Sequence, residues 1–312
     1  VRSRRQRQMC IRDSHANQLG EAATVVVSSA IRDDNPELVE ARARGLRVLH
    51  RSAALASLMH GRVGISIAGT HGKTTTTGMT AVMLDAAGAD PSYVIGSPLA
   101  ASGTSSHLGS GEAFIVEADE SDGSFLQYPT AIAVVTNVEA DHLDHWATPQ
   151  AYLEGFERFA SQSGVRALVA GTDDLGAEEL ARRVQARGIP VVTYGTGEDV
   201  DVRLENLDFE GTHASCDLSY EGESVNLQLK VPGKYNLENA AAAYAVGRLL
   251  GLNHEDLLRG AGEFTGTLRR FQLVGTEGRV AVYDDYAHHP TELRAALTAA
   301  RRAVGVDGRL IA

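Results

Sequence analysis

The stretch Ile67-Ala68-Gly69-Thr70-His71-Gly72-Lys73-Thr74-Thr75 decides how the rest of this sequence is interpreted. It continues an apolar run at residues 64–68 that is typical of a buried strand, and a helical segment follows it. Glycines let backbone N–H groups approach phosphate oxygens at a helix N-terminus, a lysine adds positive charge, and a threonine hydroxyl can bind Mg²⁺. The stretch therefore predicts a loop, residues 69–75, that holds a nucleoside triphosphate with Mg²⁺.

The loop departs from the strict G-x-x-x-x-G-K-[ST] spacing, because Ile67 stands where the first glycine would be. The alternative interpretation is an ordinary glycine turn before a surface helix. The Lys-Thr-Thr ending and the preceding strand favour the phosphate-binding loop.

Composition and charge exclude several kinds of partner. The net charge of −11 argues against nucleic acid, because phosphates would be repelled. No apolar run is long enough to span a bilayer, so we expect no membrane role. The two cysteines, Cys10 and Cys216, have neither metal-ligand spacing nor a disulfide framework, which predicts a cytoplasmic location.

Both ends of the chain differ from the rest. Residues 1–14 carry five arginines in an otherwise acidic chain and lack apolar periodicity, so we interpret them as a tail foreign to the fold. At the other end, Leu310-Ile311-Ala312 stops within what we expect to be a strand, which suggests a fragment.

Between these ends, strands and helices alternate, which predicts a doubly wound α/β fold with a mostly parallel sheet. The expected strands are Ala23–Ala30, Leu46–Leu49, Gly64–Ala68, Ala113–Val116, Ala131–Thr136, Val165–Ala170, Val191–Tyr194 and Val280–Tyr283. The expected helices are Asn35–Arg44, Ala53–Met59, Thr74–Ala87, Tyr152–Ser161, Leu175–Arg187, Leu237–Leu250, Glu255–Gly260 and Thr291–Ala303. Period-two patterns at Ala214–Tyr220 and Val225–Val231 predict antiparallel hairpins appended to this core.

An acidic cluster, Glu117-Ala118-Asp119-Glu120-Ser121-Asp122, directly follows an expected strand. Open α/β sheets bind ligands at the carboxyl ends of their strands, and crowded carboxylates need a neutralising cation. The cluster therefore predicts a Mg²⁺ site beside the phosphate loop, with a solvated acidic loop as the alternative.

Polar residues also follow the next strand, in Thr136-Asn137-Val138-Glu139-Ala140-Asp141-His142. A lone histidine usually has a structural role. Here His142 emerges at the same sheet edge as the phosphate loop, so it is a candidate to bind a metal or a transferring phosphoryl group.

Later motifs offer further candidates. Asn236 and Asn239 lie three apart at an expected helix start, where Asn236 is either the N-cap or a contact to the nucleotide base. Asp285 and His288 follow a strand, and Arg270 precedes it at an expected domain junction. Arg270 either swings onto the transferring phosphate or belongs to a surface basic pair.

Five motifs together resemble the Mur ligases, most closely the type that adds L-alanine to UDP-N-acetylmuramate. They are GTHGKTTTT at 69–77, EADESD at 117–122, TNVEADH at 136–142, GKYNLENA at 233–240 and DDYAHHPTE at 284–292, in the family's order. The resemblance implies three domains: the second half of a UDP-sugar domain at 15–60, a central ATPase at 61–262, and the start of a Rossmann-like C-terminal domain at 263–312. The family's glycine-rich UDP-binding turn and most of its third domain are absent from the chain.

The resemblance implies ATP-dependent amide formation in peptidoglycan precursor synthesis, through an acyl phosphate. It assigns the transferring phosphoryl group to Lys73, Mg²⁺ to Thr74 and Glu117, and a second metal or the acyl phosphate to His142. Asn236 and Asn239 match positions near the nucleotide. Arg270 and Asp285 match positions that complete the site, and His288 lies close to them. The implied partners are small molecules, and we expect a monomer or weak dimer.

Two alternatives stay open. One is a related ligase that attaches a recycled tripeptide to the same UDP-sugar. The other is a P-loop ATPase without ligase activity, which predicts a hydrophobic strand ending in Asp; Glu117 fits that poorly. Because the UDP-binding turn and much of the third domain are missing, we expect a folded central domain with little or no ligase activity.

Overall fold

The computed structural model describes residues 19–305 and 307–312, so the expected N-terminal tail, residues 1–14, lies outside the described residues. The described residues divide into two compact units, one up to residue 60 and one from residue 61 onward, which are described separately. Within the described part of the chain, no helix is both long enough and apolar enough to span a bilayer.

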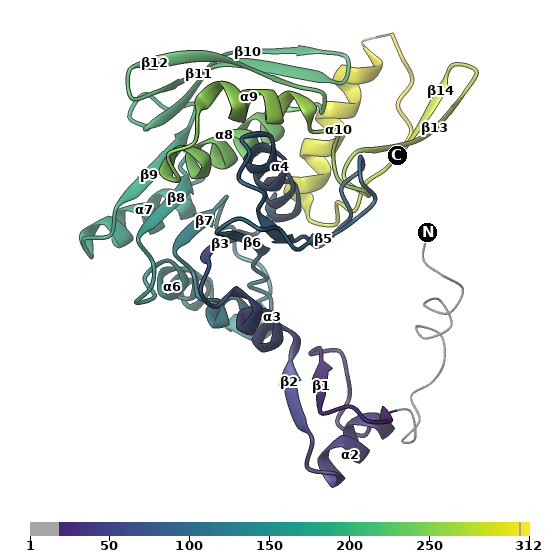
Figure 1. The fold of residues 1–312 in the computed structure, drawn as a ribbon. Helices are drawn as coiled ribbons and strands as arrows, with labels where there is room; N and C mark the ends of the chain where they lie inside the picture. Colours follow the sequence, from purple (N-terminus) through teal and green to yellow (C-terminus); the bar gives the residue numbers. More distant parts are fainter. Residues whose placement is uncertain (1–18, 306) are drawn as a thin grey trace. The chain divides into compact units, whose positions relative to one another are not determined.

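Among its described residues, the first unit holds two parallel strands and two α-helices, in the order β1 (Thr24–Val27), α2 (Pro36–Ala43), β2 (Arg47–His50), α3 (Arg51–Met59) (Figure 1). Asn35 caps α2, because its Oδ1 accepts the N–H groups of Glu37 and Leu38 at 3.0 and 3.3 Å, and Pro36 occupies the first helical position as expected. The first expected strand is present but shorter. Its apolar run also predicts a buried strand, which is wrong, because the residues of β1 alternate between exposed and half-buried in a two-stranded sheet.

The second unit is built on one ten-stranded sheet with the order β12-β11-β10-β9-β8-β7-β3-β6-β4-β5. Its strands are β3 (Val63–Ala68), β4 (Ser92–Val94), β5 (Ser106–His107), β6 (Ala113–Glu117), β7 (Ile132–Val135), β8 (Ala167–Gly171), β9 (Val191–Gly195), β10 (Val202–Glu210), β11 (His213–Tyr220) and β12 (Glu223–Leu229). All neighbouring strands in the part of the sheet ordered β10-β9-β8-β7-β3-β6-β4 pair in parallel, which confirms the mostly parallel sheet.

The expected antiparallel strands are present as β11 and β12, whereas β10 was not predicted, and the three strands are not a separate appendage. β10 pairs in parallel with β9 and antiparallel with β11, so the hairpins extend the main sheet. The period-two pattern identified the antiparallel pairing. The pattern contained no information about which preceding strand of the chain the hairpins would pair with.

Helices cover both faces of this sheet (Figure 1). On one side, α4 (Lys73–Ala86), α8 (Lys234–Leu249) and α9 (His254–Glu263) pack against one another. On the other, α6 (Pro149–Ala160) and α7 (Leu175–Ala186) contact each other and β7 to β9. Beneath α6, Phe125 of the short helix η2 (Ser124–Gln127) stacks on Phe159 with ring centroids 4.9 Å apart. Because helices cover both faces of the sheet, side chains on both sides of the parallel strands are buried. This explains why the sequences of these strands are continuous apolar runs.

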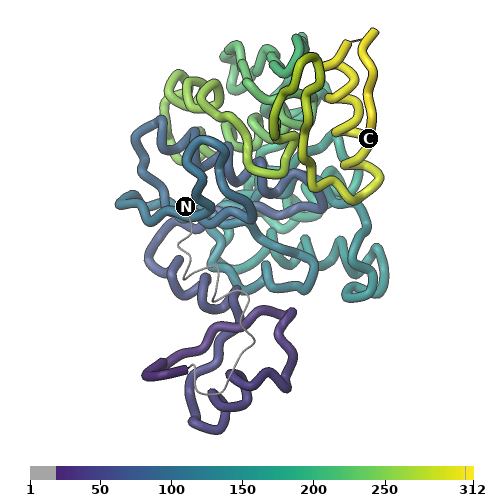
Figure 2. Tube along the Cα trace, turned by 90° about the vertical axis from the view of Figure 1, so that its right-hand side faces the viewer, coloured from purple at the N-terminus to yellow at the C-terminus, as the bar shows by residue number. Residues whose placement is uncertain are grey.

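Residues 269–312 complete the unit with a hairpin and a helix. The hairpin is β13 (Gln272–Glu277) and β14 (Val280–Asp284), and the helix is α10 (Pro290–Val304) (Figures 1 and 2). This helix contacts β10, and the guanidinium of Arg302 lies over the ring of Phe209. The sequence did not predict β13. The strand expected at Leu310–Ala312 is wrong, since the sheet of this region pairs only β13 with β14 among the described residues.

Strand order places the phosphate loop. β3 lies between β6 and β7 in the sheet. Strands β4 to β6 lie on one side of β3 and strands β7 to β12 lie on the other, so the strand order reverses direction at β3. In open α/β sheets this reversal opens a crevice at the carboxyl ends of the strands. The loop that follows β3 therefore lies where such folds bind ligands.

Candidate active site

The loop after β3 needs glycine at two positions. Gly69 has φ +133°, and a Cβ there would overlap Thr136 Oγ1 and lie 3.0 Å from the Thr136 backbone nitrogen. Gly72, the N-cap of α4, has φ +82°, and a Cβ there would lie 2.8 Å from Asn239 Oδ1. At the start of α4, the N–H groups of the first turn have no partner within the helix. The loop thus presents backbone donors at a helix N-terminus, the arrangement that favours phosphate.

The motif at residues 136–139 holds this loop in shape. The backbone N–H of His71 donates to Asn137 Oδ1 at 2.8 Å, and the Thr136 hydroxyl donates to the His71 carbonyl at 2.5 Å. The Thr70 hydroxyl donates to the Glu139 carbonyl at 2.8 Å. The third sequence motif therefore supports the phosphate loop directly.

Lys73 is folded back onto its own loop. Its Nζ donates to the carbonyls of Gly69 and Thr70, at 2.6 and 3.2 Å, and forms an ion pair with Glu120 at 2.9 Å. Glu120 is fully buried; burial raises the pKa of its carboxyl, against the opposing charge of Lys73. A solvated acidic loop is therefore wrong at Glu120. The sequence placed this residue in the cluster but gave no sign that distinguished it from its neighbours.

Thr74 and Glu117 lie together, as the sequence predicted. The Thr74 hydroxyl donates to Glu117 Oε1 at 3.0 Å, and the backbone N–H of Gly96 donates to Glu117 Oε2 at 2.6 Å. Hydroxyl and carboxylate oxygens are the ligands that Mg²⁺ prefers. This donor set fits Mg²⁺ at the edge of the loop.

Among the described residues, His142 makes no recorded hydrogen bond or ion pair with this pair. It is the residue before the short helix α5 (Leu143–Trp146) and has φ +50°. The side-chain interaction that the structure records for it is with Asp141, whose Oδ2 lies 3.7 Å from His142 Nε2. The contact of His142 with a metal or phosphoryl group stays a prediction.

The two asparagines lie at the start of α8, and Asn239 reaches the loop helix. Its Oδ1 accepts the hydroxyl of Thr76 at 3.0 Å, and its Nδ2 donates to Asn236 Oδ1 at 3.4 Å. Asn236 is not an N-cap, because α8 begins three residues earlier than expected, after Gly233 with φ +97°. Its Nδ2 instead donates to the carbonyl of Pro232 at 2.7 Å.

The C-terminal segment brings Arg270 to the loop. Arg270 Nη2 donates to the Thr74 hydroxyl at 3.5 Å, and its Nη1 lies 3.7 Å from Glu292 Oε1. The surface-pair alternative is wrong for Arg270, whose side chain is 29% exposed and faces the site, whereas that of Arg269 is 59% exposed.

Asp285 and His288 have structural partners within this segment. Asp285 accepts the backbone N–H groups of Phe271 and Ala287, both at 2.7 Å, and so links the two sides of the β13–β14 hairpin. His288 is exposed, and its Nδ1 lies 3.4 Å from Glu292 Oε2. Of these two residues, Asp285 lines the cavity described next.

A cavity of about 600 Å³ lies beside the loop. A volume of this size is typical of small-molecule sites. Loop residues, the 136–139 motif, the start of α8 and one side of α10 form its walls; among them are His71, Gly72, Asn137, Lys234, Asn239 and Arg270.

The structure also reveals a charged group that the sequence analysis missed. His71 Nε2 lies 3.0 Å from Glu139 Oε2, and His71 Nδ1 lies 3.4 Å from Glu292 Oε1. Burial lowers the pKa of His71, but the two carboxylates raise it more, and the net shift is upward. Burial raises the pKa of Glu292, but His71, the His288 N–H and Arg270 bring it down to about 2. A histidine inside a glycine loop was the only signal in the sequence.

Comparison with known proteins identifies the class to which this fold and loop belong. The model of the Mur ligase middle domain matches residues 67–247, that of the Mur ligase family catalytic domain residues 8–62, and that of the Mur ligase glutamate ligase domain residues 269–312. The chain belongs to the Mur ligase family.

Individual relatives carry more specific names. The UDP-N-acetylmuramate–L-alanine ligase of Cutibacterium acnes is 68% identical over 94% of this chain, and that of Paenarthrobacter aurescens is 52% identical over 93%. The chain spans 63% of the length of each. The solved structure of the UDP-N-acetylmuramate–alanine ligase MurC from Thermotoga maritima matches with a TM-score of 0.83 and 27% identity, over 96% of this chain and 69% of that one.

Proposed function

We propose that this chain carries the ATP-binding centre of a ligase that joins L-alanine to the lactyl carboxylate of UDP-N-acetylmuramate, in peptidoglycan precursor synthesis. The observation that carries the proposal is the convergence of Lys73, the Thr74–Glu117 pair and Arg270 at the loop after β3. Residues His71, Gly72 and Thr75 of this loop line one cavity together with Arg270. The similarity to proteins named for this reaction supports the choice of substrates.

In the proposed reaction, an oxygen of the lactyl carboxylate attacks the γ-phosphorus of ATP, and ADP leaves. The amine of L-alanine then attacks the acyl carbon, and inorganic phosphate leaves from the tetrahedral intermediate. Little covalent chemistry falls to the protein, so its residues act by positioning groups and by neutralising charge.

The loop residues divide these tasks. The N–H groups at the start of α4 bind phosphate oxygens. The ammonium of Lys73 exchanges its hydrogen bonds with the carbonyls of Gly69 and Thr70 for contacts with the transferring phosphoryl group, whose charge it neutralises. The ion pair with Glu120 limits how far this ammonium moves. Thr74 and Glu117 would hold Mg²⁺, which would supply positive charge to the phosphates. Arg270 adds a second cation from the C-terminal segment.

Other residues have supporting roles in the proposal. Asn236, Asn239 and His288 lie around the nucleotide, Asp285 shapes the segment that carries Arg270, and His142 engages the acyl phosphate or a second metal. We retain the division into a partial UDP-sugar domain (15–60), a central ATPase (61–262) and a C-terminal domain (263–312). A buried free thiol at Cys216 agrees with a reducing, cytoplasmic location.

The test is a phosphate-release assay on a full-length version of the protein, with ATP, UDP-N-acetylmuramate and either L-alanine or the recycled tripeptide. Release with L-alanine alone supports the proposal. Release with the tripeptide alone supports the recycling ligase, and release that needs neither acceptor supports a simple ATPase.

The same assay tests the phosphate loop. Lys73→Ala is expected to abolish phosphate release while the fold is retained, because the transition state loses its nearest ammonium. Lys230→Ala, at an exposed lysine, is the matched control and should be as active as the unmodified protein. Undiminished turnover in Lys73→Ala would remove the assignment of this loop.

A further inference from the structure

One imidazole on the phosphate loop lies between two carboxylates, and the proposed reaction gives this arrangement no role. Glu139 lies 3.0 Å from Nε2 of His71, and Glu292 lies 3.4 Å from its Nδ1. A neutral imidazole has one N–H and one lone pair, so it can donate to only one of these carboxylates. The other contact requires a second positive partner, which is either a proton or a metal ion.

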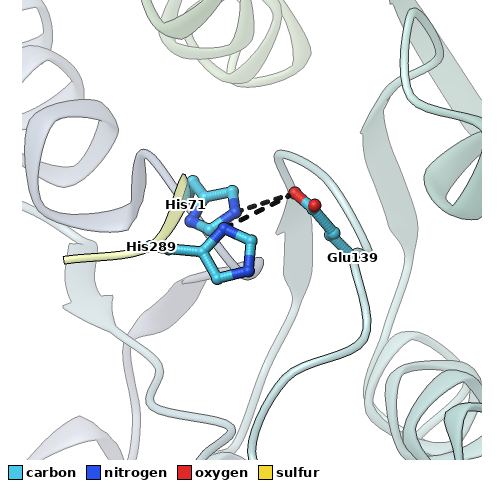
Figure 3. A group of neighbouring side chains, drawn as sticks. All are labelled: His71, Glu139 and His289. Carbon is cyan, nitrogen blue, oxygen red and sulfur yellow. Dashed lines mark hydrogen bonds and ion pairs between the residues drawn. The ribbon is translucent and has the colours of Figure 1, made fainter. Parts of the chain in front are cut away.

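A second imidazole completes the group. The rings of His71 and His289 lie with centroids 4.6 Å apart, and both point to the carboxylate of Glu139 (Figure 3). His289 Nδ1 lies 3.9 Å from Glu139 Oε2. One ligand atom from each of the three residues falls within 4.8 Å of the other two. Ligand atoms around a tetrahedral Zn²⁺ are roughly 3.3–3.6 Å apart, as bond lengths near 2.0–2.2 Å imply. Shifts on the order of 1 Å would bring these atoms to that spacing.

The surrounding residues orient this group as a metal site requires. Glu292 faces Nδ1 of His71, so with a metal bound the N–H would lie on Nδ1 and leave Nε2 as the ligand. The Thr291 hydroxyl donates to Glu139 Oε1 at 2.9 Å, which fixes the carboxylate while Oε2 faces the imidazoles. Ligand histidines in metal sites characteristically give their other N–H to a carboxylate or carbonyl. His289 Nδ1 also accepts the Thr291 N–H as the N-cap of α10, a bond that metal binding would replace.

We propose that His71, Glu139 and His289 form a binding site for a divalent transition metal of the Zn²⁺ class. Two imidazoles and one carboxylate suit Zn²⁺ and discriminate against Mg²⁺, which prefers an all-oxygen shell. The site is therefore distinct from the Mg²⁺ position at Thr74 and Glu117. Its ligands come from the phosphate loop, from the 136–142 motif and from the residue before α10. A bound ion ties the C-terminal segment to the loop.

The test measures metal binding and is independent of the ligase proposal. The whole chain is stripped with a chelator, and Zn²⁺ is titrated against a chromogenic competitor in millimolar Mg²⁺. We expect one Zn²⁺ bound per chain that excess Mg²⁺ does not displace. Absence of binding, or full displacement by Mg²⁺, would overturn the proposal.

Two variants test the ligands Glu139 and His289, and a third is the control. His289→Asn keeps an N-cap oxygen for α10 but removes the imidazole, and Glu139→Gln keeps an acceptor for the Thr291 hydroxyl but removes the charge. Each should weaken Zn²⁺ binding by roughly a hundredfold, because a three-ligand site loses a ligand or its anion. His288→Asn removes the neighbouring exposed imidazole and should bind Zn²⁺ as the unmodified chain does. Equal binding in all four proteins, or an equal loss in His288→Asn, contradicts the assignment.

A second measurement covers the case in which a variant does not fold. Crystals of the unmodified chain soaked in Zn²⁺ should give an anomalous difference peak between His71, Glu139 and His289 at the zinc edge. A strong peak only at Thr74 and Glu117, or only at other surface histidines, refutes the proposal.

Discussion

Replacing Gly69 by alanine tests whether the close approach of the phosphate loop to the strand beside it is as tight as the structure indicates. The added Cβ would overlap Thr136 Oγ1 and lie 3.0 and 3.2 Å from the backbone nitrogens of Thr136 and Asn137. Rotating the Thr136 side chain relieves only the first overlap. The two backbone contacts persist, so the main chain itself has to move.

The magnitude follows from three contributions. A φ of +133° is a region that residues other than glycine rarely adopt, at a cost of about 1–3 kcal/mol. Turning the Thr136 hydroxyl away from the His71 carbonyl, which it meets at 2.5 Å, loses about 1 kcal/mol. Overpacking against backbone adds about 1–3 kcal/mol. Together these predict a loss of roughly 3–7 kcal/mol in the free energy of unfolding, less whatever loop relaxation recovers.

The chain offers a matched control and its own reporter. Gly88 follows the same helix α4 and also has a positive φ, +76°, but a Cβ there meets no atom within 4 Å. Gly88→Ala should therefore cost only about 1 kcal/mol, from its backbone conformation alone. Trp146 is the single tryptophan and is buried in the second unit, so its fluorescence in a urea titration reports unfolding of the unit that holds both glycines.

Unfolding midpoints for Gly69→Ala and Gly88→Ala that agree within error would refute this reasoning. A further check is the Gly69→Ala, Thr136→Ala double variant. It should recover part of the loss, because the side-chain overlap is gone while the backbone overlap remains.

Two other predictions rest on single contacts in the second unit. Gly155→Ala, within α6, should destabilise the protein although alanine is the better helix former, because its Cβ would lie 2.5 Å from Cζ3 of Trp146; a urea midpoint above that of the unmodified protein would contradict it. Burial, helped by the charge of Asp217, raises the pKa of the Cys216 thiol from 9.0 to about 12. Cys10→Ser removes the other cysteine. In that background, a disulfide reagent at pH 8 should therefore react with the thiol only after unfolding. The raised pKa means that this thiol's contribution to stability is present below pH 9 and lost between pH 9 and 12; rapid, stoichiometric reaction of the native protein would show that the thiol is neither buried nor protonated as described.

Local patterns were sufficient for most of the fold. Continuous apolar runs identified the parallel strands β3, β6, β7 and β8, because a sheet covered on both faces excludes polar residues from either side. The Asn35–Pro36 pair identified the start of α2, because capping depends on neighbours in sequence. The start of α8 was placed three residues late, since Gly233 ended the preceding segment and no capping side chain marked the boundary.

Pairing between distant segments was not visible in the sequence. β13 was missed because its residues are mostly exposed and show no clean alternation. The junction of β10 with β9 was missed because a hairpin pattern specifies its own strands and contains no information about a third.

The sequence by itself identified the glycine loop with its lysine and threonine, and the carboxylate at 117 beside it, since these follow strands whose ends meet at one sheet edge. Only the tertiary structure decided what surrounds them. Lys73 pairs with Glu120 across 47 residues, and His71 meets Glu139 across 68. His289 directly precedes the last helix, α10, and Glu292 lies in its first turn. The reason is physical: a motif fixes local backbone geometry and chemistry, whereas a partner's identity depends on which strands and helices pack together, and that is settled by burial over the whole domain.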